Sequence, residues 1–175
     1  MSTIMEVMKT RRSVRKFKSD MVPKELIEQI MEAGTYAASG NNVQVPVTIA
    51  VTNADKCNEL RKINAKIMGK DETFDPFYGA PVILIVLAKK ERRTYVYDGS
   101  LVMGNMMLSA HELGLGTCWI HRAKEEFEMP EWREWAESLG IEGEFEGIGH
   151  LALGYPDGAL PKASPRRECR TYIVE

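Results

Sequence analysis

Apolar and polar residues follow two patterns along this chain, one typical of amphipathic helices and one typical of buried strands. Segment 23–34 begins with Pro, carries apolar residues three and four positions apart and ends with Gly, which predicts a helix. Segment 81–88 is a continuous apolar run, which predicts a strand covered on both faces. Asp55 is expected to cap a further helix. The remaining expected helices are 4–8, 55–68, 95–113 and 124–139, and the remaining expected strands are 45–52, 117–121 and 145–153.

The expected helix at 95–113 is apolar on nearly every side, which sets it apart from the other helices. A helix of this kind must be buried. We therefore expect part of its surface to meet a second copy of the chain in a homodimer, the alternative being a single central core helix. Gly99 and Gly104 would allow neighbouring elements to approach it closely.

The length of 175 residues is enough for one well-buried core and short for two. We therefore expect a single domain over residues 1–175. The tail, residues 157–175, ends in four apolar-leaning residues at 171–174 that cannot form a core of their own. We expect them to add an edge strand, with the tail acting as an arm that reaches the partner subunit.

Charge and hydropathy limit the class of protein. The chain has 23 basic and 25 acidic residues, a net charge of -2, whereas a nucleic-acid-binding protein is usually basic over a whole face. No apolar run approaches the roughly 20 residues of a membrane span, and the N-terminal region is too charged for a secretory signal. The three cysteines are widely spaced and form no CxxC pair, which suggests neither disulfides nor a zinc site. We expect a cytoplasmic protein that contacts neither membrane nor nucleic acid.

A basic turn at residues 11–18 is the first candidate for chemistry. It places Arg11, Arg12, Ser13 and Arg15 directly after the short apolar run at 4–8. Guanidinium groups bind phosphate in a bidentate manner, and a hydroxyl can add a hydrogen bond, so the turn suggests a phosphorylated ligand. The alternatives are a solvated surface or a weak nucleic-acid patch, and a small dimeric nucleic-acid-binding module is the least favoured function.

Other polar groups complete this hypothesis. Arg166 and Arg167 form a second basic cluster, and Asn42 and Gln44 lie in a loop rich in side-chain amides, which can both donate to and accept from a heteroaromatic ring. The backbone at 117–121, after a Gly turn, could donate further N–H groups. The sequence offers no obvious nucleophile or acid-base pair, which suggests that a bound cofactor performs the chemistry.

Isolated reactive residues are better explained by structure. Cys118 lies in an apolar strand context, where a buried and inert thiol is expected. The histidines His111, His121 and His150 are scattered, so we expect structural roles and no metal site.

Five short motifs together resemble the nitroreductase family of FMN-dependent oxidoreductases. In chain order they lie at 11–15, 39–44, 77–81, 114–120 and 153–156, the last followed by Arg166 and Arg167. Each motif alone is weak, but five in this order across nearly the whole chain are specific. The resemblance implies an α+β, three-layer fold with a mixed central β-sheet flanked by helices, assembled as an intertwined homodimer with FMN bound at the interface by both chains.

The resemblance also implies roles for individual residues. Arg11, Arg12 and Ser13 would bind the phosphate and ribityl chain, with Arg166 or Arg167 completing the phosphate clamp, and Arg15 would reach the pyrimidine edge of the flavin. The other subunit would contribute Ser39, Gly40, Asn42 and Gln44. The backbone near the reactive flavin nitrogen would be that of Trp119, Ile120 and His121. The chemistry would take place on the flavin, without a catalytic side chain. The side chains of Trp119 and His121 belong either to the substrate pocket or to the core.

The activity that the resemblance implies is a two-electron, ping-pong transfer from NAD(P)H through FMN to a nitroaromatic, a quinone or a related acceptor. One alternative is a flavin-binding protein without NAD(P)H turnover, which stores the cofactor or senses redox state. Another is a reductase of a different acceptor, such as an enone or a halogenated phenol.

Overall fold

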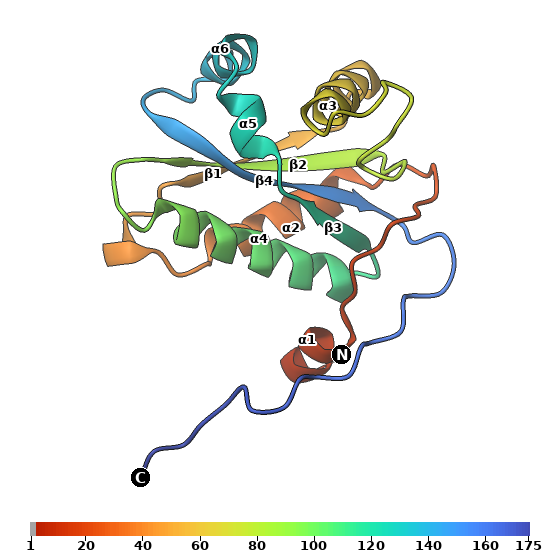
Figure 1. Cartoon of the computed structure of the whole chain (residues 1–175), viewed down its shortest axis with the longest axis vertical. Helices are drawn as coiled ribbons and strands as arrows, with labels where there is room; N and C mark the ends of the chain where they lie inside the picture. Colours follow the sequence, from red (N-terminus) through yellow and green to blue (C-terminus); the bar gives the residue numbers. More distant parts are fainter. Residues whose placement is uncertain (1–2) are drawn as a thin grey trace.

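The computed structural model describes residues 3–175 and has helices on both faces of one four-stranded sheet (Figure 1). The helical elements are α1 (Ile4–Thr10), α2 (Lys24–Thr35), the 3-10 turn η1 (Gly40–Asn42), α3 (Ala54–Ile67), α4 (Tyr95–Glu112), α5 (Ala123–Phe127) and α6 (Pro130–Ser138). The strands are β1 (Pro46–Val51), β2 (Val82–Lys89), β3 (Gly116–Ile120) and β4 (Phe145–Gly154). The α+β class with three layers is confirmed.

The sheet has the strand order β1-β2-β4-β3, and every neighbouring pair of these strands is antiparallel. The parallel component expected of a mixed sheet is confined to an isolated bridge between Ser13 and Thr117. This bridge holds the basic turn beside β3, where the Val14 N–H donates to the Thr117 carbonyl at 2.9 Å. Gly116 makes the approach possible, because a Cβ there would lie 2.6 Å from Val14 Cγ2.

Strand β2 is buried on both faces, as its continuous apolar run predicts. Side chains of a strand alternate between the two faces of the sheet. Ile83, Ile85 and Leu87 therefore enter the core under α3, α5 and α6, whereas Val82, Leu84 and Val86 enter the core above α2 and α4. The sheet thus separates two apolar layers, which fixes α4 on the face opposite α3.

The expected single helix at 124–139 is wrong in one respect, because it is two helices. Helix α5 ends at Phe127 and α6 begins at Pro130, with Met129 extended between them at φ -80° and ψ 135°. Proline has no N–H to continue a helix and its ring disfavours a helical conformation at the preceding residue. The apolar spacing of Phe127 and Trp132 continues across the break, which is why the pattern alone suggested one helix.

Two further expectations concern local contacts. Asn53, and not Asp55, caps α3, since its side chain accepts a hydrogen bond from the Lys56 N–H at 2.9 Å. Gly99 does allow close packing, because a Cβ there would lie 2.6 Å from Ile148 Cγ1. Gly104 has no such neighbour within 4 Å in the described part of the chain, so the expected close approach there is not made within one chain.

Helix α4 buries only part of its apolar surface. Val102, Met103 and Met106 pack against the sheet, but Tyr97 is 71% exposed and Leu101 is 50% exposed. These exposed side chains do not fit the alternative of a single central core helix, and the expectation that a second copy of the chain covers them stays a prediction. Within residues 3–175, neither α4 nor another helix has the length and hydrophobicity that a membrane crossing requires.

The tail, residues 157–175, is exposed throughout; it runs past α1, and its C-terminal end extends away from the sheet (Figure 1). The segment 171–174 pairs with no strand of the described chain. Tyr172, Ile173 and Val174 are 79%, 89% and 96% exposed. The assignment of the tail as an arm to a partner, and of 1–175 as one domain, stays a prediction.

Candidate functional site

The basic turn begins where α1 ends. Thr3 and Glu6 form a capping box, in which the Glu6 N–H donates to the Thr3 hydroxyl and the Thr3 N–H donates to Glu6 Oε2 at 2.7 Å. The helix ends at Thr10, and Arg11 continues in extended conformation toward the bridge at Ser13. The arginines therefore occupy a segment that is fixed at one end by a capped helix and at the other by β3.

A cavity of about 450 Å³ opens beside this turn, and residues from both ends of the chain line it. Its walls are Met8, Lys9, Arg11, Arg12, Ser13, Lys162, Ala163, Ser164 and Arg166. We call it the basic cavity. The structure thus brings together the two basic clusters that the sequence separates by about 150 residues. It also selects Arg166, since Arg167 does not line this cavity.

Two nitrogen atoms in this region are buried without a hydrogen-bond partner in the described structure, Arg11 Nη1 and Arg12 Nε. Arg12 uses its Nη1 to donate to the carbonyls of Lys9 at 2.8 Å and Arg11 at 2.6 Å, which holds its side chain against the turn. A buried, unpaired polar group is costly, so an unpaired guanidinium nitrogen beside a cavity indicates a place for an acceptor.

Electrostatics at the turn also favour an anion. Burial lowers the pKa of Arg11, and the neighbouring charge of Arg12 lowers it further. The pKa of His111 is lowered by burial and then by the charges of Arg11 and Arg12. Burial is the larger cause of both shifts, and positive charge without a compensating anion adds to it. A bound phosphate would offset the part of each shift that comes from this charge.

Lys162 and Ser164 lie in the cavity wall but were not among the residues that the sequence suggested. They belong to the tail, where no regular pattern indicates which side chains turn inward. Arg15, which the sequence suggested, is exposed and does not line the basic cavity.

The amide loop, residues 39–44, is held by its own side chains. The Gln44 N–H donates to Ser39 Oγ at 3.0 Å, and Gln44 Nε2 donates to Asn42 Oδ1 at 2.9 Å. Asn41, Asn42 and Gln44 adopt positive φ values of 54°, 56° and 52°, a conformation that asparagine tolerates better than most residues. The loop therefore has a defined and strained shape.

A buried carboxylate fixes this loop to α4. Asp98 is 3% exposed, and its Oδ1 accepts from the Gly40 N–H at 3.1 Å while its Oδ2 accepts from the Thr94 hydroxyl at 3.1 Å. A small cavity of about 120 Å³ lies beneath, with Ser39, Gln44 and Asp98 in its wall. The sequence did not suggest Asp98, whose apolar helix gave no sign of a functional carboxylate.

The amide loop and the basic turn, beside which the basic cavity opens, lie at opposite ends of α4 (Figure 1). Asp98 holds the loop near the start of the helix, whereas the His111 ring near its end contacts the Thr10 hydroxyl at 2.8 Å. The 13 residues between Asp98 and His111 correspond to roughly 20 Å along an α-helix. One chain therefore does not bring these two candidate parts of the site together.

The end of β3 supplies the last candidate residues. The Trp119 indole is partly buried and packs over β4, with its Nε1 2.5 Å from the position of a Cβ on Gly149. Ile120 is 5% exposed, and His121 is exposed. Trp119 is thus packed with the core residue Met103, while the ring of His121 faces solvent. Cys118 is buried and its pKa is raised by burial, as expected for an inert thiol.

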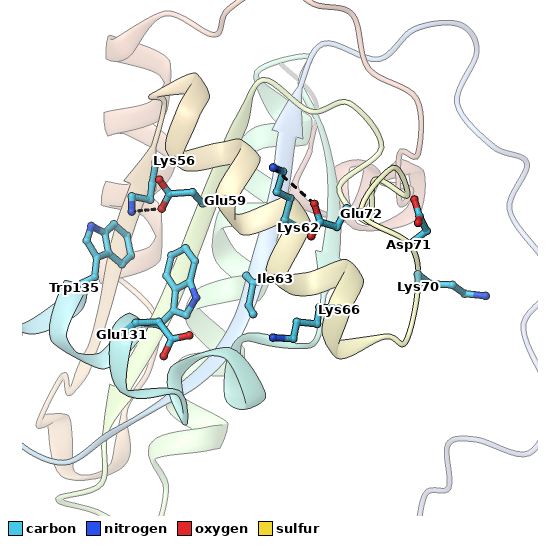
Figure 2. A pocket seen from close by; sticks show the side chains of 11 residues that line it. Lys56, Glu59, Lys62, Ile63, Lys66, Lys70, Asp71, Glu72, Glu131 and Trp135 are labelled. Atoms are coloured by element: carbon cyan, nitrogen blue, oxygen red, sulfur yellow. Dashed lines mark hydrogen bonds and ion pairs between the residues drawn. The ribbon is translucent and has the colours of Figure 1, made fainter.

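A second groove, of about 670 Å³, lies between α3 and α6 on the opposite layer (Figure 2). Its lysines and carboxylates are balanced, four of each, and Lys56–Glu59 and Lys62–Glu72 form ion pairs at 2.5 Å and 3.8 Å. Lys56 also lies 5.2 Å from the Trp132 ring centroid. This groove has no excess of positive charge, so it is a poorer phosphate site than the basic cavity.

Comparison with known proteins identifies what the chain is similar to. The family model described as "Nitroreductase family" matches residues 8–155. A protein of Methanothermobacter thermautotrophicus, provisionally named NADH dehydrogenase/NAD(P)H nitroreductase, is 33% identical over 66% of this chain, and the match spans 59% of that relative's length. An iodotyrosine deiodinase of Thermotoga neapolitana is 25% identical, with 96% of each chain covered.

A solved structure agrees with the family match. The crystal structure of a nitroreductase with bound FMN from Bacteroides fragilis has a TM-score of 0.90 with this chain, at 32% identity and with 100% of each chain covered.

Proposed function

The chain belongs to the nitroreductase family, and on that premise we propose that it is an FMN-dependent oxidoreductase. In this proposal two electrons pass from NAD(P)H to the flavin and then, in a ping-pong cycle, to a nitroaromatic, a quinone or a related acceptor. The observation that carries the proposal is the basic cavity, where arginines from both ends of the chain converge on a space with unpaired buried guanidinium nitrogens. The Bacteroides fragilis relative, at 32% identity, was crystallised with FMN.

The residues present fit the phosphate end of FMN. The residues that line the cavity include Arg11, Arg12 and Arg166 with guanidinium groups, Lys162 with an ammonium group and Ser13 with a hydroxyl. Charge-assisted hydrogen bonds of this kind are among the strongest in proteins. Their number suits a phosphomonoester, which carries nearly two negative charges at neutral pH.

The amide loop would complete the site from a second chain. Because it lies roughly 20 Å from the basic cavity of its own chain, Ser39, Gly40, Asn42 and Gln44 can reach the flavin only if a partner provides them. The exposed apolar side chains of α1 and α4, and of the residue that follows α2, support such a homodimer. They include Ile4, Met5, Met8, Tyr36, Tyr97 and Leu101, each at least 50% exposed. Burying a patch of this kind is a strong driving force for association.

The tail would then bind the partner. Edge strand β3 is already bridged by Ser13, whereas the outer edge of β1 has no strand beside it among the described residues. We infer that segment 171–174 adds to β1 of the partner, which would bury the exposed Tyr172, Ile173 and Val174. Residues 1–175 would in this way form one domain with a C-terminal arm.

When bound, FMN would supply the two-electron chemistry that no side chain of this chain can supply. The chain's own residues would orient it. Arg15, exposed within the turn, would lie at the pyrimidine edge, where a cation stabilises the negative charge that develops on the ring. The backbone of Trp119, Ile120 and His121 would lie near the reactive nitrogen. The packed indole of Trp119 would keep that backbone rigid.

Two alternatives retain flavin binding. The chain could hold FMN without NAD(P)H turnover, as a store or redox sensor, and failure of both dinucleotides to bleach the flavin would favour that function. A different acceptor, such as a halogenated phenol, is favoured by one observation, the similarity to an iodotyrosine deiodinase over 96% of each chain.

A complementation experiment tests the two-chain site. Arg11→Ala should disable the phosphate end of a site and Asn42→Ala should disable the amide loop, so each homodimer should bind FMN weakly. Mixed dimers of the two variants contain one intact site and should recover about half of the wild-type flavin content. Mixed dimers that bind no more FMN than either parent would contradict a site shared between chains.

A further inference from the structure

The end of β2 and the connection that follows it to α4 carry an unusual concentration of positive charge. Residues 89–93 comprise four basic residues, Lys89, Lys90, Arg92 and Arg93, and one acidic residue, Glu91. We call them the basic segment. The whole chain has a net charge of -2, so this local charge is not part of a generally basic surface. None of these residues belongs to the proposed flavin site.

The two arginines of the basic segment form no ion pair within the described residues. Lys90 lies 3.7 Å from Glu146, and Glu146 is also contacted by Lys124 at 3.7 Å and by the Tyr95 hydroxyl at 3.2 Å. Arg92 and Arg93, in contrast, are exposed and have no acidic partner within 4.0 Å among residues 3–175.

The backbone of the segment is nevertheless ordered. The Tyr95 N–H donates to the Arg92 carbonyl at 3.2 Å, and the Lys90 N–H donates to the Glu144 carbonyl at 2.7 Å. The two arginines therefore project from a fixed turn instead of a loose loop.

This turn adjoins the amide loop. Thr94, the next residue, packs so closely on Gly40 that a Cβ there would clash with the Thr94 hydroxyl, and Asp98 one helical turn later binds the Gly40 N–H. Both segments lie at the same end of α4 (Figure 1). A ligand that stacks on a flavin next to the amide loop would thus meet the basic segment at the edge of the site.

We propose that Arg92 and Arg93 bind a phosphate of the reducing substrate and that they favour the 2′-phosphorylated dinucleotide, NADPH. The proposal rests on the proposed function, because it needs the flavin beside the amide loop. The nicotinamide would stack there, and the phosphate-bearing remainder of the donor would extend over the surrounding surface. Both dinucleotides carry the pyrophosphate, but only NADPH adds a phosphomonoester with nearly two negative charges, which two adjacent guanidinium groups suit.

The test compares Arg92→Gln/Arg93→Gln with wild type, both loaded with FMN. Calorimetry would measure the affinity for adenosine 2′,5′-bisphosphate and for AMP, and steady-state kinetics would measure KM for NADPH and NADH. We expect the variant to bind the bisphosphate at least about tenfold more weakly than wild type, and its KM for NADPH to be higher by a similar factor. This is the size of effect that the loss of a hydrogen bond to a charged group produces. AMP binding and KM for NADH should change less than about twofold.

A control variant carries the same change in charge elsewhere. Lys62→Gln/Lys66→Gln removes two cations from the groove between α3 and α6, on the layer opposite α4 (Figure 2). This variant should leave unchanged the affinities for adenosine 2′,5′-bisphosphate and AMP and the KM values for NADPH and NADH. An equal effect of both variants would show a nonspecific charge effect and overturn the proposal.

Other results would also overturn it. If wild type does not distinguish adenosine 2′,5′-bisphosphate from AMP, or if KM rises equally for NADPH and NADH, the arginines do not recognise the 2′-phosphate. Failure of the proposed function itself looks different, since wild type would then retain no FMN or would hold a flavin that neither dinucleotide bleaches. A flavin that is retained and reduced equally well by either dinucleotide in both proteins contradicts the specificity alone.

Discussion

Removing the Arg11 side chain should weaken FMN binding without harming the fold. Its Nη1 atom is buried without a partner and its guanidinium lines the basic cavity, so in the proposed complex it donates to the phosphate. A hydrogen bond to a charged group contributes ~1.5–3 kcal/mol. Because the cavity is open to water and several other cations line it, we expect the lower part of that range for Arg11→Ala, roughly 10- to 30-fold in Kd.

The free protein should tolerate this change. The pKa of Arg11 is lowered by burial and by the charge of Arg12, so in the absence of a ligand the guanidinium is held at a cost. Arg11→Ala should therefore leave the unfolding temperature of the flavin-free protein unchanged or slightly higher. Arg11→Lys keeps the charge but loses the planar, bidentate geometry, and its Kd should lie between those of Arg11→Ala and wild type.

The assay is a titration of flavin-free protein with FMN, followed by quenching of flavin fluorescence. Lys18→Ala is the matched control, since Lys18 ends the basic turn, is exposed and does not line the basic cavity, and its backbone N–H donates to the Tyr155 carbonyl at 2.9 Å. An unchanged Kd for Arg11→Ala, or an equal loss for Lys18→Ala, would refute the assignment of the basic cavity to the phosphate.

Three further predictions concern the loop, the interface and pH. Gly40→Ala should weaken FMN binding because its Cβ clashes with the Thr94 hydroxyl. Adding Thr94→Ala should restore part of the affinity in the same titration. Equal affinities of the single and the double variant would contradict the role of the amide loop in FMN binding. Leu101→Glu should give a mass near one 19.7 kDa chain by light scattering and lose FMN, whereas a wild type that is already monomeric would contradict the dimer. The pKa of His111 in the folded chain lies below its ordinary value of 6.5, so the unfolded state binds more protons between these two values. The stability that neutral His111 contributes is therefore present in full above pH 6.5 and is lost as pH falls from 6.5 through the lower folded-state pKa. His111→Gln should flatten that fall in a series of denaturant titrations, and a parallel pH dependence in both proteins would exclude His111 as the cause.

Much of the fold follows from local pattern. The continuous apolar run of β2 and the Pro start of α2 needed no tertiary information. The wrong predictions were those of helix ends, where a proline or a capping side chain decides the boundary and the periodicity of apolar residues does not. Pro130 breaks a helix whose apolar spacing continues across it, and Asn53 caps α3 two residues before the acidic candidate.

The site was less predictable, because its parts are assembled by distant contacts. The sequence pointed to Arg11 and to Arg166 or Arg167, but only the folded tail decides that Arg166 lines the cavity and adds Lys162. Asp98 gave no signal, since a carboxylate that binds a backbone N–H 58 residues away leaves no local motif. The separation of the amide loop from the basic cavity is likewise a property of α4 and not of any motif.

The most direct test of the central claim is an anaerobic visible spectrum of the purified protein before and after addition of NADPH and then NADH. The proposed oxidoreductase should show a bound flavin absorbance that bleaches on addition of a dinucleotide and returns when a quinone or nitroaromatic acceptor is added. A protein that carries no flavin and does not retain added FMN, or a bound flavin that neither dinucleotide bleaches, would contradict it.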